Sequence, residues 1–138
     1  MRSTQDLRGD NVIDSRDLIA RRDYLAEELA DCLSVEETPE GVKAAQAEWD
    51  SGDEAEELRD IEVFLEEGTR EFQHGETLIR DSYFEEYARE LAEGVSDYNA
   101  RSESWPFTCI DWEKAAEELK QDYTYEELGS YTYWFRNC

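Results

Sequence analysis

The sequence predicts an α+β protein that is mainly helical, with an N-terminal helical hairpin or extension and a C-terminal helix-helix-β-hairpin unit. Two observations predict this class. Apolar residues recur at helical spacing along most of the chain, and aromatic residues cluster in two short runs near its end. The 138 residues, 39% of them hydrophobic and 12% aromatic, suffice for one folded unit and are too few for two large cores.

The predicted N-terminal part, residues 1–76, is acidic and helical. After a polar leader, Asp14 or Ser15 can cap a helix that runs to about Leu33, because short polar side chains accept hydrogen bonds from the unpaired N–H groups of a first turn. The stripe that this helix is expected to bury consists of Leu18, the stem of Arg22, Leu25, Leu29 and Cys32 or Leu33.

Two further helices are expected in the N-terminal part. Thr38 followed by Pro39 is typical of a helix start, since proline lacks only a backbone donor that the first turn leaves unpaired. Residues 51–53 interrupt that helix before a third begins. Across residues 68–75, polar residues and glycine dilute the apolar pattern, which predicts a loop or hinge at the end of this part.

The predicted C-terminal part, residues 77–138, begins with two amphipathic helices. Residues 82–85 (SYFE) match a capping box, and apolar residues follow at helical spacing until Gly94. Asp111 is expected to cap the second helix. Between the two helices, residues 105–107 (WPF) read as an extended apolar segment, which is expected to pack into the core.

An aromatic β-hairpin is expected to close the chain, with residues 123–128 and 131–136 flanking a two-residue turn that begins with glycine. The last strand places three aromatic side chains on one face: Tyr131, Tyr133 and Phe135. Trp134 lies on the other face. Both faces therefore need cover from helices or from a second copy of the chain, and Trp134 is the candidate for a homodimer interface.

Acidic residues dominate the composition, with 37 Asp and Glu against 14 Lys and Arg and a formal charge of -23. Such a surface repels phosphates, which excludes direct nucleic-acid binding through a basic patch and disfavours anionic membranes. About 12 base pairs of duplex DNA carry a comparable charge, and carboxylates on a helix repeat about every 5.4 Å, on the scale of neighbouring phosphates. The surface can therefore imitate DNA. Alternatively it serves solubility or adaptation to salt, which the scarcity of lysine would fit.

Carboxylates expected on the exposed faces of the helices are the candidate phosphate-mimicking, partner-binding residues. They are nominated by exposure alone, since helical spacing places them away from the apolar stripes. The set is Glu27, Glu28, Asp31, Asp53, Glu56, Glu57, Asp60, Glu67, Glu86, Glu90, Glu93, Glu117 and Glu118.

No motif for catalysis, phosphate binding or metal binding accompanies this charge. The lone His74 has no nucleophile signature beside it, and Cys32, Cys109 and Cys138 are widely spaced without a CxxC pair. We expect free thiols, no enzyme activity, no cofactor and no metal site. No apolar run reaches the length of a signal peptide or a membrane span, so a cytoplasmic location is expected.

Two runs near the end of the chain carry a family resemblance. Residues 82–92 (SYFEEYARELA), residues 110–124 (IDWEKAAEELKQDYT) and the closing hairpin follow in an order that resembles the ArdA antirestriction proteins and related phage proteins. The resemblance covers about residues 77–138. Residues 1–76 do not resemble the N-terminal part of that family.

Proteins of this family are encoded by phages and mobile elements, are elongated and often dimeric, and act as DNA mimics against type I restriction-modification enzymes. The resemblance therefore implies a non-catalytic inhibitor that occupies the DNA-binding site of a host defence complex in a bacterial cell. A CRISPR effector complex is an equal alternative target. A different class of function stays open as well: an acidic adaptor or scaffold that binds a basic protein through its helices without DNA mimicry.

Overall fold

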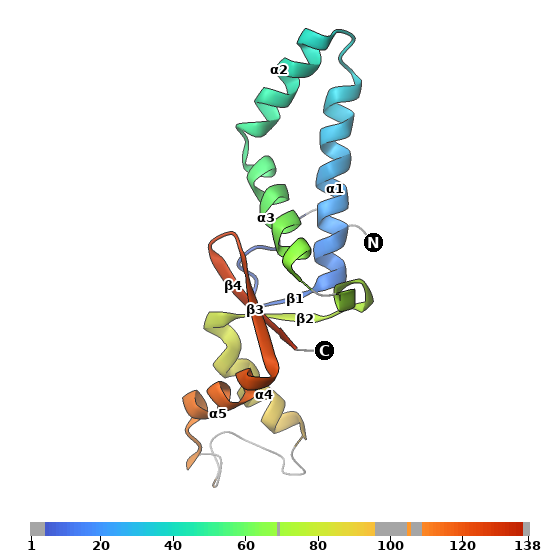
Figure 1. The fold of residues 1–138 in the computed structure, drawn as a ribbon. Helices are drawn as coiled ribbons and strands as arrows, with labels where there is room; N and C mark the ends of the chain where they lie inside the picture. The colour runs from blue at the N-terminus through green and yellow to red at the C-terminus, as the bar shows by residue number, and fades with distance from the viewer. Residues whose placement is uncertain (1–4, 69, 96–104, 106–108, 137–138) are drawn as a thin grey trace.

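A four-stranded antiparallel sheet separates two layers of helices (Figure 1). The computed structural model describes residues 5–68, 70–95, 105 and 109–136, with the backbone alone at residues 70–71 and 93–95. The strands are β1 (Val12–Asp14), β2 (Thr77–Arg80), β3 (Tyr123–Leu128) and β4 (Tyr131–Arg136), in the order β1-β2-β4-β3. The predicted C-terminal hairpin is therefore confirmed, and its strand β4 also pairs with β2.

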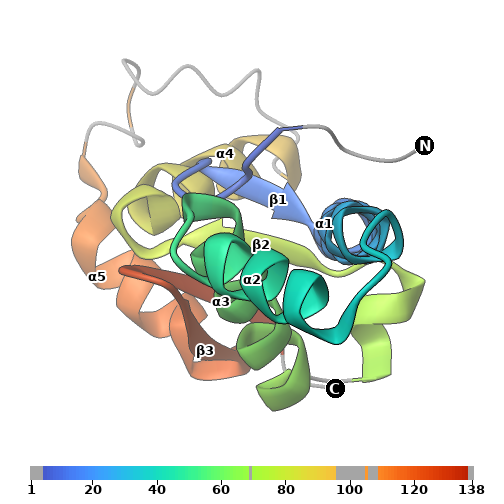
Figure 2. The same cartoon turned by 90° about the horizontal axis from the view of Figure 1, so that it is seen from above.

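Helices cover both faces of this sheet. The first layer comprises α1 (Ser15–Ser34), α2 (Pro39–Asp50) and α3 (Asp53–Glu67), and the second comprises α4 (Phe84–Val95) and α5 (Trp112–Leu119). Three short 3₁₀ turns, η1 (Arg70–His74), η2 (Asp81–Tyr83) and η4 (Lys120–Asp122), connect helices to strands. Figure 2, seen from above, shows α1 close to end-on, with α2 and α3 seen obliquely in front of the sheet. The prediction of a mainly helical α+β protein is confirmed.

Three helix starts follow from local sequence. The side chains of Asp14, Thr38 and Asp111 each accept a hydrogen bond from a backbone N–H in the first turn of the helix that follows, at 2.9, 3.0 and 3.1 Å. Pro39 occupies the first position of α2, where its missing donor costs nothing. These caps confirm the predicted starts of α1, α2 and α5.

Two predictions for the C-terminal part are wrong. Residues 82–85 do not start a helix as a capping box, because the chain leaves β2 directly into η2 and α4 continues from that turn. Trp105 is 79% exposed rather than packed in the core. The core on that side of the sheet is formed instead by residues of β2, β3, β4, α4 and α5, with α4 and α5 in contact with each other. Phe107 lies outside the described residues.

The buried stripe of α1 is also shorter than predicted. The buried arginine is Arg21 and not Arg22, and Cys32 is exposed. Complete burial ends at Leu25, because only the first half of α1 lies against the sheet and α3, whereas its far end has α2 alone beside it (Figure 1). Helical spacing identifies an apolar stripe correctly, but it does not show where the covering elements end.

Strands β1 and β2 are additions that the sequence did not predict. Val12 pairs with Ile79 and Ile13 with Leu78, so the sheet joins strands from both sides of the predicted boundary after residue 76. Ser15 fixes this junction: it is buried, its Oγ donates to the carbonyl of Phe72 at 2.7 Å, and its N–H donates to the carbonyl of residue 76 at 2.9 Å. The division into parts 1–76 and 77–138 stays a prediction.

The first hydrophobic core lies between the sheet and helices α1 and α3. Phe64 of α3 stacks on Phe72 of η1 with ring centroids 5.6 Å apart, and it meets Tyr133 and Phe135 of β4 edge-on at 6.4 and 6.3 Å. All four rings are buried. Aliphatic side chains complete this core: Ile13, Leu18, Leu25, Leu58, Ile61, Leu78 and Leu128.

The second core lies on the opposite face of the sheet, under α4 and α5. Phe84 of α4 meets Tyr123 of β3 and Trp134 of β4 with ring centroids 5.2 and 5.8 Å apart. Trp134 is half-buried and donates its indole N–H to Asp81 Oδ1 at 2.8 Å. Helices of the same chain therefore cover the two faces of the hairpin.

The aromatic cluster of the first core gives a stability prediction. Phe64→Ala should lower the free energy of unfolding by about 3–5 kcal/mol, because it leaves a cavity beside Phe72, Tyr133 and Phe135. Val63, the preceding residue of α3, is 51% exposed, and Val63→Ala should change the same quantity by about 0.5 kcal/mol or less. Urea unfolding followed by circular dichroism measures both. Equal losses would contradict the position of the core.

Candidate functional site

Acidic residues concentrate on helices α1, α2 and α3. Residues 23–67 contain 17 Asp and Glu and only two basic residues, Lys43 and Arg59, so this stretch holds most of the excess negative charge of the chain. We call residues 23–67 the acidic arm. Figure 1 shows that α1 and α2 extend side by side away from the sheet, and that α3 leads back to it.

The acidic arm is comparable to a short DNA duplex in length and charge. At about 1.5 Å per residue, residues 23–34, the part of α1 that belongs to the arm, span about 18 Å. A duplex of that length carries about 11 negative charges. The 17 acidic residues of the arm less its two basic ones leave a net charge of -15. The two charge densities are of the same order.

A buried ion pair fixes the base of the arm. Arg21 of α1 donates from Nε and Nη2 to the two carboxylate oxygens of Glu57 of α3, at 2.6 and 2.8 Å. Only 8% and 4% of the two side-chain surfaces are exposed. The hydrogen bonds to Glu57 raise the pKa of Arg21 above its ordinary value. This bidentate contact fixes the orientation of α1 relative to α3.

A second ion pair connects the arm to the segment before β1. Arg8 donates from Nη1 to Asp60 Oδ2 of α3 at 2.8 Å and from Nη2 to Asp6 Oδ2 at 2.8 Å. The pKa of Arg8 is raised, chiefly by its hydrogen bonds to Asp6 and also by those to Asp60. The two ion pairs thus neutralise Glu57 and Asp60, two of the carboxylates at the base of the arm.

Most of the predicted partner-binding carboxylates lie at the surface. The exposed ones are Glu27, Asp31, Asp53, Glu56, Glu67, Glu86, Glu90, Glu117 and Glu118. Glu28 is half-buried, and the side chain of Glu93 lies outside the described residues.

The assignment of Glu57 to the exposed set is wrong. Glu57 is 3% exposed and holds Arg21. Asp60 is also withdrawn from the surface in part, since 21% of its side chain is exposed and Arg8 pairs with it. The helical spacing of residues in α3 identified the acidic side of that helix. Spacing alone did not show that Arg21 of α1 and Arg8, before β1, lie against that side.

The exposed carboxylates fall into two groups rather than one track. The first group belongs to the arm, on α1 and α3, whereas Glu86 and Glu90 lie on α4 and Glu117 and Glu118 on α5. The sheet separates these helices from the arm (Figure 1). The arm is therefore the part of the surface on which the larger number of predicted carboxylates comes together.

The structure adds carboxylates to the base of the arm that helical spacing missed. The pKa of Glu126 on β3 is raised, first by burial and then by the charges of Glu67 and Glu127. Glu126 pairs across the hairpin with Tyr133 and shares its face of the sheet, the face that α3 covers. Strand alternation with Leu128 could have identified this position, because alternate residues of a strand share a face.

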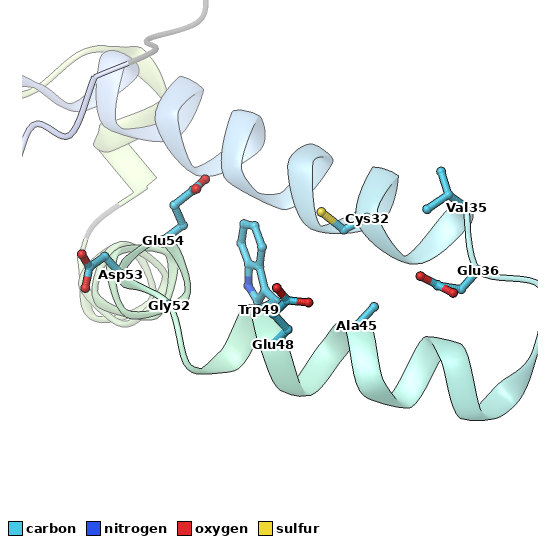
Figure 3. A pocket seen from close by; sticks show the side chains of 9 residues that line it. All are labelled: Cys32, Val35, Glu36, Ala45, Glu48, Trp49, Gly52, Asp53 and Glu54. Atoms are coloured by element: carbon cyan, nitrogen blue, oxygen red, sulfur yellow. The ribbon is translucent and has the colours of Figure 1, made fainter.

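A groove runs between α2 and the far end of α1. Its volume is about 580 Å³, and its apolar lining includes Cys32, Val35, Ala45 and Trp49. In Figure 3, Trp49 projects from α2 toward α1, and Cys32 lies on the side of α1 that faces α2. Cys32 carries a free thiol. Glu48 and Glu54 are among the acidic residues that line the same groove.

Among the described residues, no group of three or more His, Cys, Asp and Glu side chains has the arrangement needed to hold a metal ion. No described helix combines the length and apolar character needed to cross a membrane. The chain matches no protein-family model, no curated protein and no solved structure.

The buried ion pair can be tested by a double-mutant cycle. Arg21→Met should lower the free energy of unfolding by about 3–5 kcal/mol, because Glu57 would remain buried without a partner, and Glu57→Met should have a similar cost. The double variant should lose much less than the sum, since two apolar side chains then replace the pair. Urea unfolding of the four proteins provides the cycle. Additive losses would mean that the two residues do not interact.

The burial of Glu126 close to the charges of Glu67 and Glu127 predicts a pH-dependent effect. Glu126→Gln should raise the free energy of unfolding at neutral pH by less than about 1 kcal/mol, because solvent screens half-buried charges. A raised pKa means that the folded state binds the proton more tightly than the unfolded chain does. The cost of burying Glu126 therefore falls as pH falls through that pKa, and the advantage of glutamine over glutamate shrinks.

Urea unfolding at neutral pH, and at a pH below the ordinary pKa of glutamate, measures this difference. Glu118→Gln removes the same charge from an exposed site on α5 and serves as the control, with little change expected at either pH. If the stabilisation by Glu126→Gln grew on acidification, the predicted direction of the pH dependence would be wrong.

Proposed function

We propose that the protein is a non-catalytic inhibitor that imitates DNA and occupies the DNA-binding site of a host defence nuclease complex. The observation that carries this proposal is the concentration of 17 acidic residues on one helical arm that extends from the sheet. A DNA-binding site is a basic surface shaped for a highly charged rod, so an acidic rod of similar charge density can compete for it.

Electrostatics also favour a fast encounter with such a site. Opposite charges on the two surfaces steer diffusional association, and they disfavour other acidic proteins as partners. The arm contains only Lys43 and Arg59 as basic residues, and its ion pairs with Arg8 and Arg21 lie at its base. Its far end therefore presents carboxylates to a partner.

The type of target rests on the resemblance to ArdA antirestriction proteins. The residues that carry the resemblance form α4, α5 and the hairpin of β3 and β4. On this basis the target is a type I restriction-modification enzyme or a CRISPR effector complex in the cytoplasm of a bacterial host, and the gene belongs to a phage or mobile element. The protein needs no cofactor for this role.

Matched charge variants test the proposal in a DNA cleavage assay with the purified nuclease complexes. The arm variant combines Asp31→Asn, Asp53→Asn, Glu56→Gln and Glu67→Gln. It should inhibit at least about fourfold less well than the native protein, since each of the four exposed charge pairs contributes about 0.2–1 kcal/mol. Each single substitution should cost less than about fivefold. Inhibition should also weaken steeply as salt increases.

The control variant changes the net charge equally on the other helical layer. It combines Glu86→Gln, Glu90→Gln, Glu117→Gln and Glu118→Gln, all at exposed positions of α4 and α5. It should retain most of the inhibition. Equal losses in both variants would indicate that only the total charge matters and would overturn the role of the arm. A partner whose binding duplex DNA does not displace would favour the adaptor function instead.

A further inference from the structure

Helix α2 has no completely buried side chain. It is 12 residues long, which is too short for an isolated helix to be stable in water without packing. Trp49, near its end, packs against the first core, whereas Val42, two helical turns earlier, is 36% exposed. The apolar side of α2 is therefore only partly covered within the chain.

The groove beside this helix combines an apolar floor with an acidic border. Cys32, Ala45 and Trp49 form the floor within a volume of about 580 Å³ (Figure 3). Carboxylates line it at both ends, with Glu36 near the tip of the arm and Asp53 at the start of α3. None of its lining residues is basic.

We infer that this groove is a docking site for a basic peptide segment of the target protein, one that inserts an apolar side chain between α1 and α2 and contacts the carboxylates with flanking lysines or arginines. Charge complementarity selects this occupant. A second copy of the chain would bring another arm with a net charge of -15, and duplex DNA would be repelled for the same reason.

The groove would supply selectivity that carboxylates alone lack. Carboxylates that imitate phosphates suit any DNA-binding surface, because phosphate contacts position a partner without distinguishing it. Burial of an apolar side chain adds affinity that salt does not screen, and it requires a partner with that side chain in the right place. This inference rests on the proposed function, since a DNA-binding target is what makes the partner basic.

The test uses a display library of short peptides in which fixed lysines and arginines flank randomised central positions. Selection against the immobilised full-length protein at elevated salt should enrich large apolar residues at those positions. Recovery of basic peptides with no preference at the central positions would overturn the inference.

Two matched variants then locate the selected peptides. Ala45→Trp fills the groove and should weaken peptide binding by about tenfold or more, the loss expected when one apolar side chain cannot be buried. Ala47→Trp makes the same change on the exposed side of α2 and should leave binding within about twofold. Circular dichroism checks that both variants keep their helices. Equal binding by both variants would overturn the inference.

A second readout leaves the groove unaltered. In a variant with Cys109→Ser and Cys138→Ser, the thiol of Cys32 is the only one that can react with a neutral thiol reagent. A bound peptide should slow this reaction by about fivefold or more, because it covers the floor of the groove. An unchanged rate at saturating peptide would place the peptide elsewhere and overturn the inference.

The nuclease assay separates failure of this inference from failure of the proposed function. If the arm variant loses inhibition while Ala45→Trp keeps both inhibition and peptide binding, the groove inference fails and DNA mimicry stands. If apolar basic peptides occupy the groove but the native protein inhibits neither nuclease complex, the docking site stands and the proposed function fails.

Discussion

Strand β4 carries aromatic side chains to both faces of the sheet, and both hydrophobic cores depend on it. Tyr133 and Phe135 point into the core under α1 and α3, while Trp134 points into the core under α4 and α5. A single strand thereby holds the two helical layers together through side chains that alternate along it. The position of the arm follows from this packing, because α3 is fixed on the sheet by Phe64 against the same strand.

Basic residues are placed where the excess negative charge would otherwise oppose folding. Arg21 and Arg8 neutralise carboxylates at the base of the arm. On the other face, Lys120 lies 5.2 Å from the ring centre of Phe84 and 4.8 Å from that of Trp134, within range of cation–π attraction. These three cations thus contribute near the two cores, whereas solvent and salt screen the repulsion among the exposed carboxylates of the arm.

The arm joins two kinds of recognition in the functional proposal. Its carboxylates act over several ångströms and attract any basic surface, whereas the groove between α1 and α2 acts only on contact and depends on shape. Helix α2 links them, since it contributes Trp49 to the groove floor and Glu48 to the acidic border. A charged surface and an apolar anchor on one helical hairpin would allow long-range attraction and selective binding by the same element.

Local sequence determined the helix caps at Asp14, Thr38 and Asp111 and the β-hairpin, because each of these depends on residues close together in the chain. Composition alone determined the net acidity. The tertiary structure alone decided which carboxylates reach the surface. Glu57 satisfies the same helical pattern as its exposed neighbours, and it is buried because Arg21, 36 residues away, packs against it. Strands β1 and β2 and the groove likewise depend on contacts between segments that are distant in the chain. The apolar periodicity within one segment does not indicate which distant segment will pack against it.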